Sequence, residues 1–357
     1  MKFVAGVDCH KHSHTIVVLD HLGVQQAHLK ISADPDGYEK ALEAVAAFVE
    51  LEWGIESTGF YGYGFAQALV ARGYVVFEVP GSVTKRHRRQ GTRRGKSDPI
   101  DAQAIAEAVL RERDRLPRFE RNDAQDAIRL LYDHRDRLVK ERTTAGNRLR
   151  ALALRLGLTE LPRELWSVRR LQALRARLEP FRGASLTADA LVDEIAESIV
   201  DIERTTNRIL ETERRLRPFV KCAAPGLLRL RGVATIVAAG LFGHAGSLRN
   251  CRDANAFAMR AGVAPVTFAS GMSTAVRVNN LGDRQLNRCL HVIAMTQIRL
   301  PDHPGHVYYD RKRAEGKSHR AALRALKRQL ATITYYRLRD ESALATDRTP
   351  ASISNAA

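Results

Sequence analysis

The chain has 357 residues, enough for two or three domains that each bury a hydrophobic core. Its 57 Lys and Arg residues outnumber 40 Asp and Glu residues, which gives a formal net charge of +17. Such an excess favours a polyanionic partner, because each neutralised phosphate releases condensed counterions, although a basic protein without such a partner has the same signature. The four cysteines match no disulfide or zinc spacing, and no signal peptide or membrane-length apolar stretch is visible. We therefore expect a cytoplasmic protein with no membrane partner.

Predicted strands and helices alternate over residues 1–115. Apolar runs predict strands at 3–7, 14–19, 24–31, 51–55 and 74–79, and helical spacing predicts helices at 38–49 and 60–72. Three strands followed by helix, strand, helix and strand is the order of a ribonuclease-H-like domain. We predict this α/β fold for the N-terminal domain.

Four carboxylates in this domain are placed so that they can converge. Asp8 and Glu56 each close an apolar run, while Asp98 and Asp101 lie three residues apart where a helical pattern starts. Mg²⁺ prefers oxygen ligands, and two such ions ~3.5–4 Å apart can stabilise the attacking and leaving oxygens of a phosphoryl transfer. An Asp at a strand end is usually a turn or cap residue, and Asp98 before Pro99 also suits a helix N-cap. Catalytic and structural interpretations therefore both remain open.

A basic tract immediately precedes Asp98 and contains no acidic residue. A run of charge is usually a solvated surface, but its position here favours contact with backbone phosphates. The predicted contacts are Lys85, Arg86, Arg88, Arg89, Arg93, Arg94 and Lys96. His10, His12 and His14 alternate beside Asp8, which on a strand would place them on one face. Because no further Cys or His lies at ligand spacing, we expect them near phosphate rather than on a metal.

Two heptad-like patterns follow in residues 116–219, which predict a coiled-coil linker. Gly157 and a proline-containing stretch at 161–180 separate them. The pattern is compatible with an antiparallel hairpin that packs on itself and with an intermolecular coiled coil. The apolar positions are Leu131, Leu138, Ala145, Leu149, Leu152 and Leu156, then Ile195, Ile199, Ile202, Thr206, Ile209 and Leu216.

Residues 220–340 form a third, mainly helical segment. Residues 230–241 resemble a helix-hairpin-helix element, in which a glycine turn presents backbone N–H groups to phosphate, although one such turn is a weak signal. A second basic stripe starts at 311–313 and continues along a helix whose opposite face is Leu323, Leu326, Leu330 and Ile333. Predicted nucleic-acid contacts here are Arg277, Arg320, Arg324, Lys327 and Arg328. The tail 341–357 is small and polar, and we expect it to be disordered.

Ser270 lies between an apolar stretch and a turn. From the residues alone a Ser beside Gly is nearly always a turn residue, and no Ser-His-Asp arrangement is deducible around it. A hydroxyl next to a metal-bound phosphate could still act as a nucleophile if a base or the metal lowered its pKa.

Four separate motifs in order give the chain a resemblance to a known family. Gly6-Val7-Asp8-Cys9-His10-Lys11, Ile55-Glu56-Ser57-Thr58-Gly59, Lys96-Ser97-Asp98-Pro99-Ile100-Asp101-Ala102 and Ala269-Ser270-Gly271 carry the resemblance. They are similar to those of the DEDD insertion-sequence transposases, the IS one-ten family, also described as bridge-RNA-guided, serine-dependent recombinases. The similarity extends over nearly the whole chain, including 282–288 and 313–317.

The resemblance implies a RuvC-like N-terminal domain, a coiled-coil linker and a C-terminal transposase domain. It implies that Asp8, Glu56, Asp98 and Asp101 hold Mg²⁺, with Mn²⁺ as a substitute, and that Ser270 forms a phosphoserine link to DNA. It also implies donor and target DNA, a noncoding bridge RNA, and homodimers that assemble into homotetramers with an active site shared between subunits. That picture favours an intermolecular role for the coiled coil.

Three functional hypotheses follow. The first is a transposase or site-specific recombinase that cuts and rejoins DNA with Mg²⁺ and Ser270. The second is a RuvC-like structure-selective endonuclease in which water attacks. The third is a non-enzymatic, basic nucleic-acid-binding protein whose acids are structural.

Overall fold

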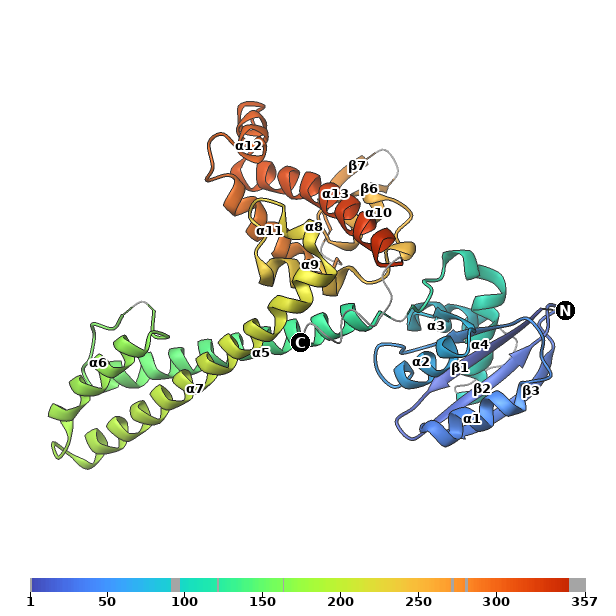
Figure 1. Cartoon of the computed structure of the whole chain (residues 1–357), viewed down its shortest axis with the longest axis horizontal. Coiled ribbons are helices and arrows are strands. Elements are labelled where there is room, and N and C mark those ends of the chain that lie inside the picture. The colour runs from blue at the N-terminus through green and yellow to red at the C-terminus, as the bar shows by residue number, and fades with distance from the viewer. Residues whose placement is uncertain are drawn as a thin grey trace. The chain divides into compact units, whose positions relative to one another are not determined.

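The computed structural model describes residues 2–90, 97–120, 122–162, 164–270, 273–279 and 282–346 (Figure 1). The chain divides into two compact units: Met1–Asn122 with Ser247–Arg252, and Asp123–Gly246 with Asp253–Ala357. None of the helices in the described ranges combines the length and apolar character that a membrane crossing requires. The prediction of an α/β N-terminal region followed by a mainly helical remainder is confirmed.

A five-stranded mixed sheet forms the centre of unit 1. The strands lie in the order β3-β2-β1-β4-β5; β1, β2 and β3 pair antiparallel, while β4 and β5 continue parallel to β1. The strands are β1 (Phe3–Cys9), β2 (Ser13–Leu19), β3 (Gln25–Ser32), β4 (Leu51–Ile55) and β5 (Val75–Glu78). The helices are α1 (Pro35–Ala44), α2 (Tyr63–Ala71), α3 (Gly81–Gln90), α4 (Asp98–Glu112) and the short η1 (Arg113–Arg115).

Both faces of this sheet are buried, and the two-residue period of the strands decides which residue faces which layer. Ala5 and Val7 pack with Trp53 of β4 in the cluster that α1 and α2 cover. Val4 lies instead in the cluster beneath α4, with Ile105 and Val109 of that helix. Even-numbered positions of β1 therefore point toward α4, and so do Gly54 and Glu56 at the end of β4.

Helix α4 lies unusually close to β1. A Cβ added at Gly6 would lie 2.1 Å from the carbonyl oxygen of Ala102 and 2.3 Å from the backbone nitrogen of Ala106. Only a residue without a side chain permits this approach. The close packing fixes the first turn of α4 beside the end of β1.

A segment distant in sequence completes unit 1. Asn250, in the short helix η3 (Leu248–Asn250), accepts a 2.9 Å hydrogen bond from the backbone N–H of Arg118 and donates one of 3.1 Å to its carbonyl oxygen. Arg118 in turn forms a bridge with Phe77 of β5. Residues 247–252 thus extend the hydrogen bonding at the β5 edge.

Unit 2 is built from helices and one β-hairpin. Its helices are α5 (Asp123–Arg155), α6 (Val168–Leu178), η2 (Glu179–Phe181), α7 (Leu186–Ala223), α8 (Pro225–Leu228), α9 (Thr235–Ala245), α10 (Ala254–Arg260), α11 (Arg284–Gln297), α12 (Pro304–Ala314) and α13 (His319–Thr346). The hairpin consists of β6 (Pro265–Ser270) and β7 (Ser273–Val278), with Ser270 opposite Ser273.

The two predicted coiled-coil segments pack on each other within the chain. Figure 1 shows α5 and α7 side by side, and ion pairs of Arg135 with Glu213 and of Arg148 with Glu194 give them an antiparallel register. Leu149, Ile195, Ile199 and Ile202 are buried between them, as the heptad pattern predicts. The hairpin interpretation therefore holds within one chain; an additional intermolecular role stays a prediction.

The basic tract overlaps the helix α3, and the stretch 161–180 between the two coiled-coil segments contains α6. One local prediction is wrong. Helix α4 takes Ser97 as its N-cap, so Asp98 is the first helical residue rather than the cap.

The C-terminal part also differs. The second basic stripe does not continue on one helix, because Gly316 (φ 83°) separates α12 from α13, and Ile333 is exposed rather than on the buried face. Helix α13 extends to Thr346, into the tail expected to be disordered, and residues 347–357 lie outside the described residues.

Candidate functional site

Asp8 and Glu56 lie next to each other at the end of two paired strands. Val7 pairs with Ile55 in the parallel register of β1 and β4, and the backbone N–H of Glu56 donates to the carbonyl oxygen of Val7. The next residues are Asp8, on β1, and Glu56, directly after β4, and both continue the alternation toward the face that α4 covers. Ser57 directly after Glu56 has φ 62°, a conformation that non-glycine residues rarely adopt and that is often found at functional sites.

The first turn of α4 brings the other two carboxylates to the same place. Asp98 and Asp101 both lie in that turn, where the helix dipole favours negative charge. Burial raises the pKa of Asp8, His10 opposes the shift, and the nearby charges of Asp101, Asp98 and Glu56 add to it. Since the charges of the other three acids reach Asp8, all four predicted carboxylates lie in the same neighbourhood.

His10 bridges two of these acids. Its Nε2 lies 3.2 Å from Oδ2 of Asp8 and 3.4 Å from Oδ1 of Asp98. One ligand atom from each of the three residues lies within 4.8 Å of the other two, a spacing suited to a metal ion. The sequence predicts no metal role for His10, so the structure adds it as a candidate ligand.

The other two histidines of the motif, His12 and His14, do not lie on one strand face with His10. The chain turns at 10–12 between β1 and β2, so the three histidines do not alternate along one strand. His12 lies in this turn, whereas His14 is fully buried on β2 and stacks on Tyr38. The expected row of histidines near phosphate is therefore wrong for His14.

Only part of the basic tract contacts acids of α4, and one of these contacts reaches the acid cluster. Arg88 Nη1 donates a 2.6 Å hydrogen bond to Oδ1 of Asp101, and Arg86 and the buried His87 contact Glu112 of α4 at 2.6 and 2.7 Å. Lys85 and Arg89 are on α3, and both are exposed. Arg93, Arg94 and Lys96 lie outside the described residues.

An exposed aromatic pair follows Glu56. Phe60 and Tyr61 have ring centroids 4.3 Å apart and are 71% and 42% exposed, a degree of exposure that packing does not require. Two adjacent aromatic residues after Ser57-Thr58-Gly59 are the sequence signal of this feature. Exposed aromatic rings of this kind can stack on nucleobases.

The remaining predicted residues belong to unit 2. Ser270 is the last residue of β6, and its side chain lies outside the described residues, as does that of Arg277 on β7. Arg320 is exposed on α13, and Arg328 contacts Asn255 and Thr332. Arg324 and Lys327 line a cavity in this unit.

The expected helix-hairpin-helix element is present only in part. Gly232 has the turn conformation, with φ 91°, but the helix before it, α8, is a single turn.

The acid cluster fits a divalent cation. Four carboxylates of which one has a raised pKa repel one another, and a divalent cation would relieve that repulsion. The donors Asp8, Glu56, Asp98 and Asp101 are the hard oxygen ligands that Mg²⁺ and Mn²⁺ accept. His10 adds a nitrogen donor that favours Mn²⁺ over Mg²⁺ in the same place.

Comparison with known proteins identifies the family. A family model described as "Transposase" matches residues 5–156, and one described as "Transposase IS116/IS110/IS902 family" matches residues 224–310. The chain is 27% identical to the uncharacterized 44.8 kDa protein of insertion element IS116 from Streptomyces clavuligerus, over 94% of each chain.

Two further relatives carry similar descriptions. The uncharacterized 42 kDa protein of insertion element IS900 from Mycobacterium paratuberculosis is 26% identical over 95% of this chain and 96% of its own. The transposase for insertion sequence element IS1328 from Yersinia enterocolitica is 30% identical over 55% of this chain and 57% of its own. With two family models matched in order and relatives similar along almost the full chain, this protein belongs to the IS110 family of DEDD-type DNA transposases.

Proposed function

We propose that this transposase cuts and rejoins DNA strands at a site formed by Asp8, Glu56, Asp98 and Asp101 together with Ser270. The convergence of the four carboxylates at the ends of β1 and β4 and the start of α4 is the observation that carries the proposal. The strand order β3-β2-β1-β4-β5 supports a ribonuclease-H-like, RuvC-like fold for residues 1–115.

The carboxylates would hold Mg²⁺, or Mn²⁺ in its place, and a bound divalent ion would polarise the scissile phosphate and neutralise charge on its oxygens. Asp8, Glu56 and Asp98 are fixed by strand pairing and by the helix start, and His10 orients Asp8 and Asp98. Arg88 forms an ion pair with Asp101 and so influences how strongly that acid binds a metal cation.

Ser270 would be the nucleophile. Its hydroxyl oxygen would bond to phosphorus while the bond from phosphorus to one sugar oxygen breaks; the serine proton passes to a base, and the leaving sugar oxygen takes up a proton to become a hydroxyl. A free DNA hydroxyl then attacks the phosphoserine ester, which restores Ser270 and joins the new strands. Ser270 is the last residue of β6 and pairs with Ser273 of β7, so it lies at the end of the strand pair.

The wider assembly is proposed from the family resemblance. It comprises donor and target DNA, a noncoding bridge RNA, and dimers that form a tetramer with each active site shared between subunits. The division into 1–115, the linker 116–219, the transposase domain 220–340 and the tail 341–357 stays a prediction, as does the cytoplasmic location.

Covalent trapping tests the serine mechanism. Incubating the protein with labelled DNA and Mg²⁺, and then denaturing it, should leave label on the wild-type chain and none on Ser270→Ala. Ser273→Ala, at the position paired with Ser270, is the matched control. If Ser270→Ala cleaves and religates DNA as well as wild type, water or another residue is the nucleophile.

The metal site is tested separately. Asp98→Asn and Asp101→Asn should each reduce strand cleavage by at least about 100-fold while DNA binding persists, because each variant removes a metal ligand and leaves the cations that bind phosphate in place. Glu107→Gln, an acid on the same helix hydrogen-bonded to Gln103, should cleave normally. Unchanged recombination in the Asp98 and Asp101 variants would leave the acids structural.

A further inference from the structure

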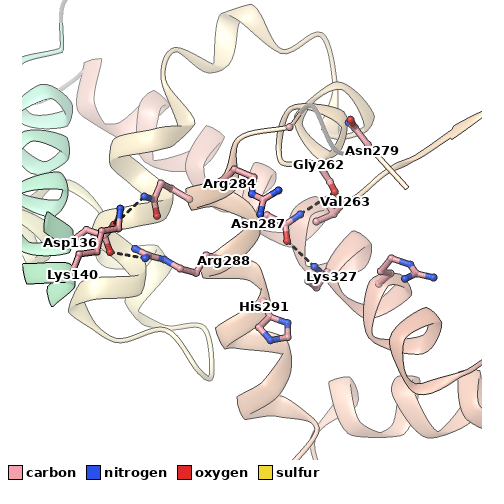
Figure 2. Close-up of a pocket in the computed structure, with 13 residues that line it drawn as sticks. Asp136, Lys140, Gly262, Val263, Asn279, Arg284, Asn287, Arg288, His291 and Lys327 are labelled. Atoms are coloured by element: carbon pink, nitrogen blue, oxygen red, sulfur yellow. Dashed lines mark hydrogen bonds and ion pairs between the residues drawn. The ribbon is translucent and has the colours of Figure 1, made fainter. Parts of the chain in front are cut away.

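A cation-lined cavity lies in unit 2, beside the two ends of the β6–β7 hairpin. Its volume is about 530 Å³, within the range of ligand pockets. Figure 2 shows side chains from α5, α11 and α13 around it. The charged residues in its lining are Lys140, Arg284, Arg288, Arg324, Lys327 and Asp136, and His291 also faces it.

The single acid of the lining cannot balance these cations. Asp136 accepts a 2.6 Å hydrogen bond from Arg288 on one oxygen, and its other oxygen lies 3.2 Å from Nζ of Lys140 and 3.3 Å from Nε2 of Gln285. Within the described part of the chain, no carboxylate lies within ion-pair distance of Arg284, Arg324 or Lys327. Among the described residues, three of the five cations in the lining therefore have no acidic partner.

Lys327 is the most constrained of them. It is partly buried, and its Nζ donates a 2.8 Å hydrogen bond to Oδ1 of Asn287, a neutral acceptor. Burial lowers the pKa of Lys327, and the neighbouring charge of Arg324 lowers it further. Cations held together without acids cost folding free energy, which an anion in the cavity would offset.

Hydrogen bonds and close packing connect the cavity wall to the residues that flank the hairpin. Asn287, which accepts from Lys327, donates hydrogen bonds of 3.1 and 3.0 Å to the carbonyl oxygens of Ala261 and Gly262, just before β6. Gly282, just after the hairpin, packs so closely that an added Cβ would lie 2.2 Å from the Cα of Gly262. An anion bound by Lys327 would therefore lie beside the base of the strand pair that ends in Ser270.

We propose that this cavity binds a backbone phosphate of a nucleic-acid strand and so fixes that strand beside the β6–β7 hairpin. Arg284 and Arg324 offer guanidinium groups for phosphate oxygens, and Lys327 offers an ammonium group from the cavity wall. The phosphodiester is common to DNA and RNA, so the chemistry fits either strand. The inference does not rest on the role of Ser270 or on the metal site.

Equilibrium binding by the full-length protein in EDTA tests the site without strand cleavage. Fluorescence anisotropy with a labelled DNA duplex and, separately, a labelled RNA hairpin gives the affinity over a range of salt concentrations. The double variant Arg324→Gln/Lys327→Gln should reduce the slope of log affinity against log salt by about 1 for each phosphate that the cavity no longer neutralises. A reduction with the duplex assigns the cavity to DNA, and one with the hairpin assigns it to RNA.

Matched variants separate this site from a general effect of charge. Arg337→Gln removes an exposed cation from another face of α13 and should leave both slopes unchanged. Arg324→Lys, which keeps the charge, should retain most of the slope, and thermal unfolding should show that every variant is folded. The proposal is overturned if the double variant binds both probes with the slope of wild type, or if Arg337→Gln causes an equal reduction.

Discussion

Arg88 donates a 2.6 Å hydrogen bond to the carboxylate of Asp101, so a cation from the basic helix α3 occupies one of the four converging acids. Both side chains are largely shielded from solvent, at 24% and 12% exposure. The protein's own guanidinium therefore competes with a divalent ion for Asp101. Helix α3, whose sequence suggests a surface for nucleic acid, also adjusts the charge of the acid cluster.

Arg88→Gln should bind Mn²⁺ more tightly than wild type. The ion pair with Asp101 competes with the metal by about 1 kcal/mol, so its removal should lower the dissociation constant for Mn²⁺ roughly fivefold. Titration followed by electron paramagnetic resonance measures the change. Arg86→Gln is the control, because its partner Glu112 lies at the far end of α4. Weaker Mn²⁺ binding by Arg88→Gln would mean instead that Arg88 holds Asp101 in place for the metal.

Asp8→Asn should stabilise the metal-free protein. Burial and three neighbouring acids raise the pKa of Asp8 in the folded state. A raised carboxyl pKa contributes stability that is complete below the unfolded value of 3.8 and is lost as the pH rises through the folded value. At pH 7 the variant should thus have a higher Tm than wild type in EDTA, and it should lose the rise in Tm that Mg²⁺ or Mn²⁺ gives to wild type. Asp114→Asn, at an exposed acid, should change neither value.

Gly6→Ala should damage both the stability and the metal site of unit 1. The new methyl group would meet backbone atoms of Ala102 and Ala106, which cannot move without shifting α4. Overpacking of this kind costs about 1–3 kcal/mol or more, and the shift would separate Asp98 and Asp101 from Asp8. Urea unfolding and metal-dependent Tm shifts measure the two effects. Gly59→Ala adds its methyl group to open space and should be neutral.

Asp283→Asn should destabilise unit 2 at neutral pH and much less in acid. Burial alone would raise the pKa of Asp283, but hydrogen bonds from His244 and from the N–H groups of Leu286 and Gln285 lower it to about 2. A lowered carboxyl pKa contributes stability above the unfolded value of 3.8 that is lost as the pH falls toward 2. At pH 7 the free energy of unfolding should be about 2 kcal/mol lower in the variant, because the stabilisation that lowers the pKa is lost. The N-cap of α11 adds little to this loss, since Asn is also a good N-cap residue.

Unfolding at several pH values checks this dependence. The difference between wild type and Asp283→Asn should shrink steadily below pH 4, where the carboxylate of wild type begins to protonate. Asp302→Asn removes an exposed acid from the same unit and should show no such trend. A pH-independent difference would indicate that the destabilisation comes from packing rather than from the charge of Asp283.

The parts of the site that lie on regular strands can be predicted from the sequence. The apolar run at 51–55 predicts β4 with its observed bounds, and the two-residue period puts Asp8 and Glu56 on one face once the strands pair. The i, i+3 spacing of Asp98 and Asp101 likewise requires only a helix start. Local pattern is enough wherever burial of one face fixes the register.

Long-range contacts explain what the sequence does not predict. Helix α3 has almost no apolar stripe, and it is held by contacts of Arg86, His87 and Arg88 with acids of α4. The cation cavity joins Lys140 to Arg288 and Lys327 across more than 180 residues, which no periodicity can reveal. His10 meets Asp98 only because the chain turns directly after β1.

The hydrogen bonds between Asn250 and Arg118 also constrain how the protein is made. Ribosomes extend the chain from its N-terminus, so residues 123–246 emerge before the segment that completes the β5 edge of unit 1. The acid-bearing sheet can thus pair its strands early, but its edge is closed only after α5 to α9 have been synthesised. A truncated chain that stops at residue 122 would leave that edge open, with the backbone of Arg118 unpaired and able to add a strand from another molecule.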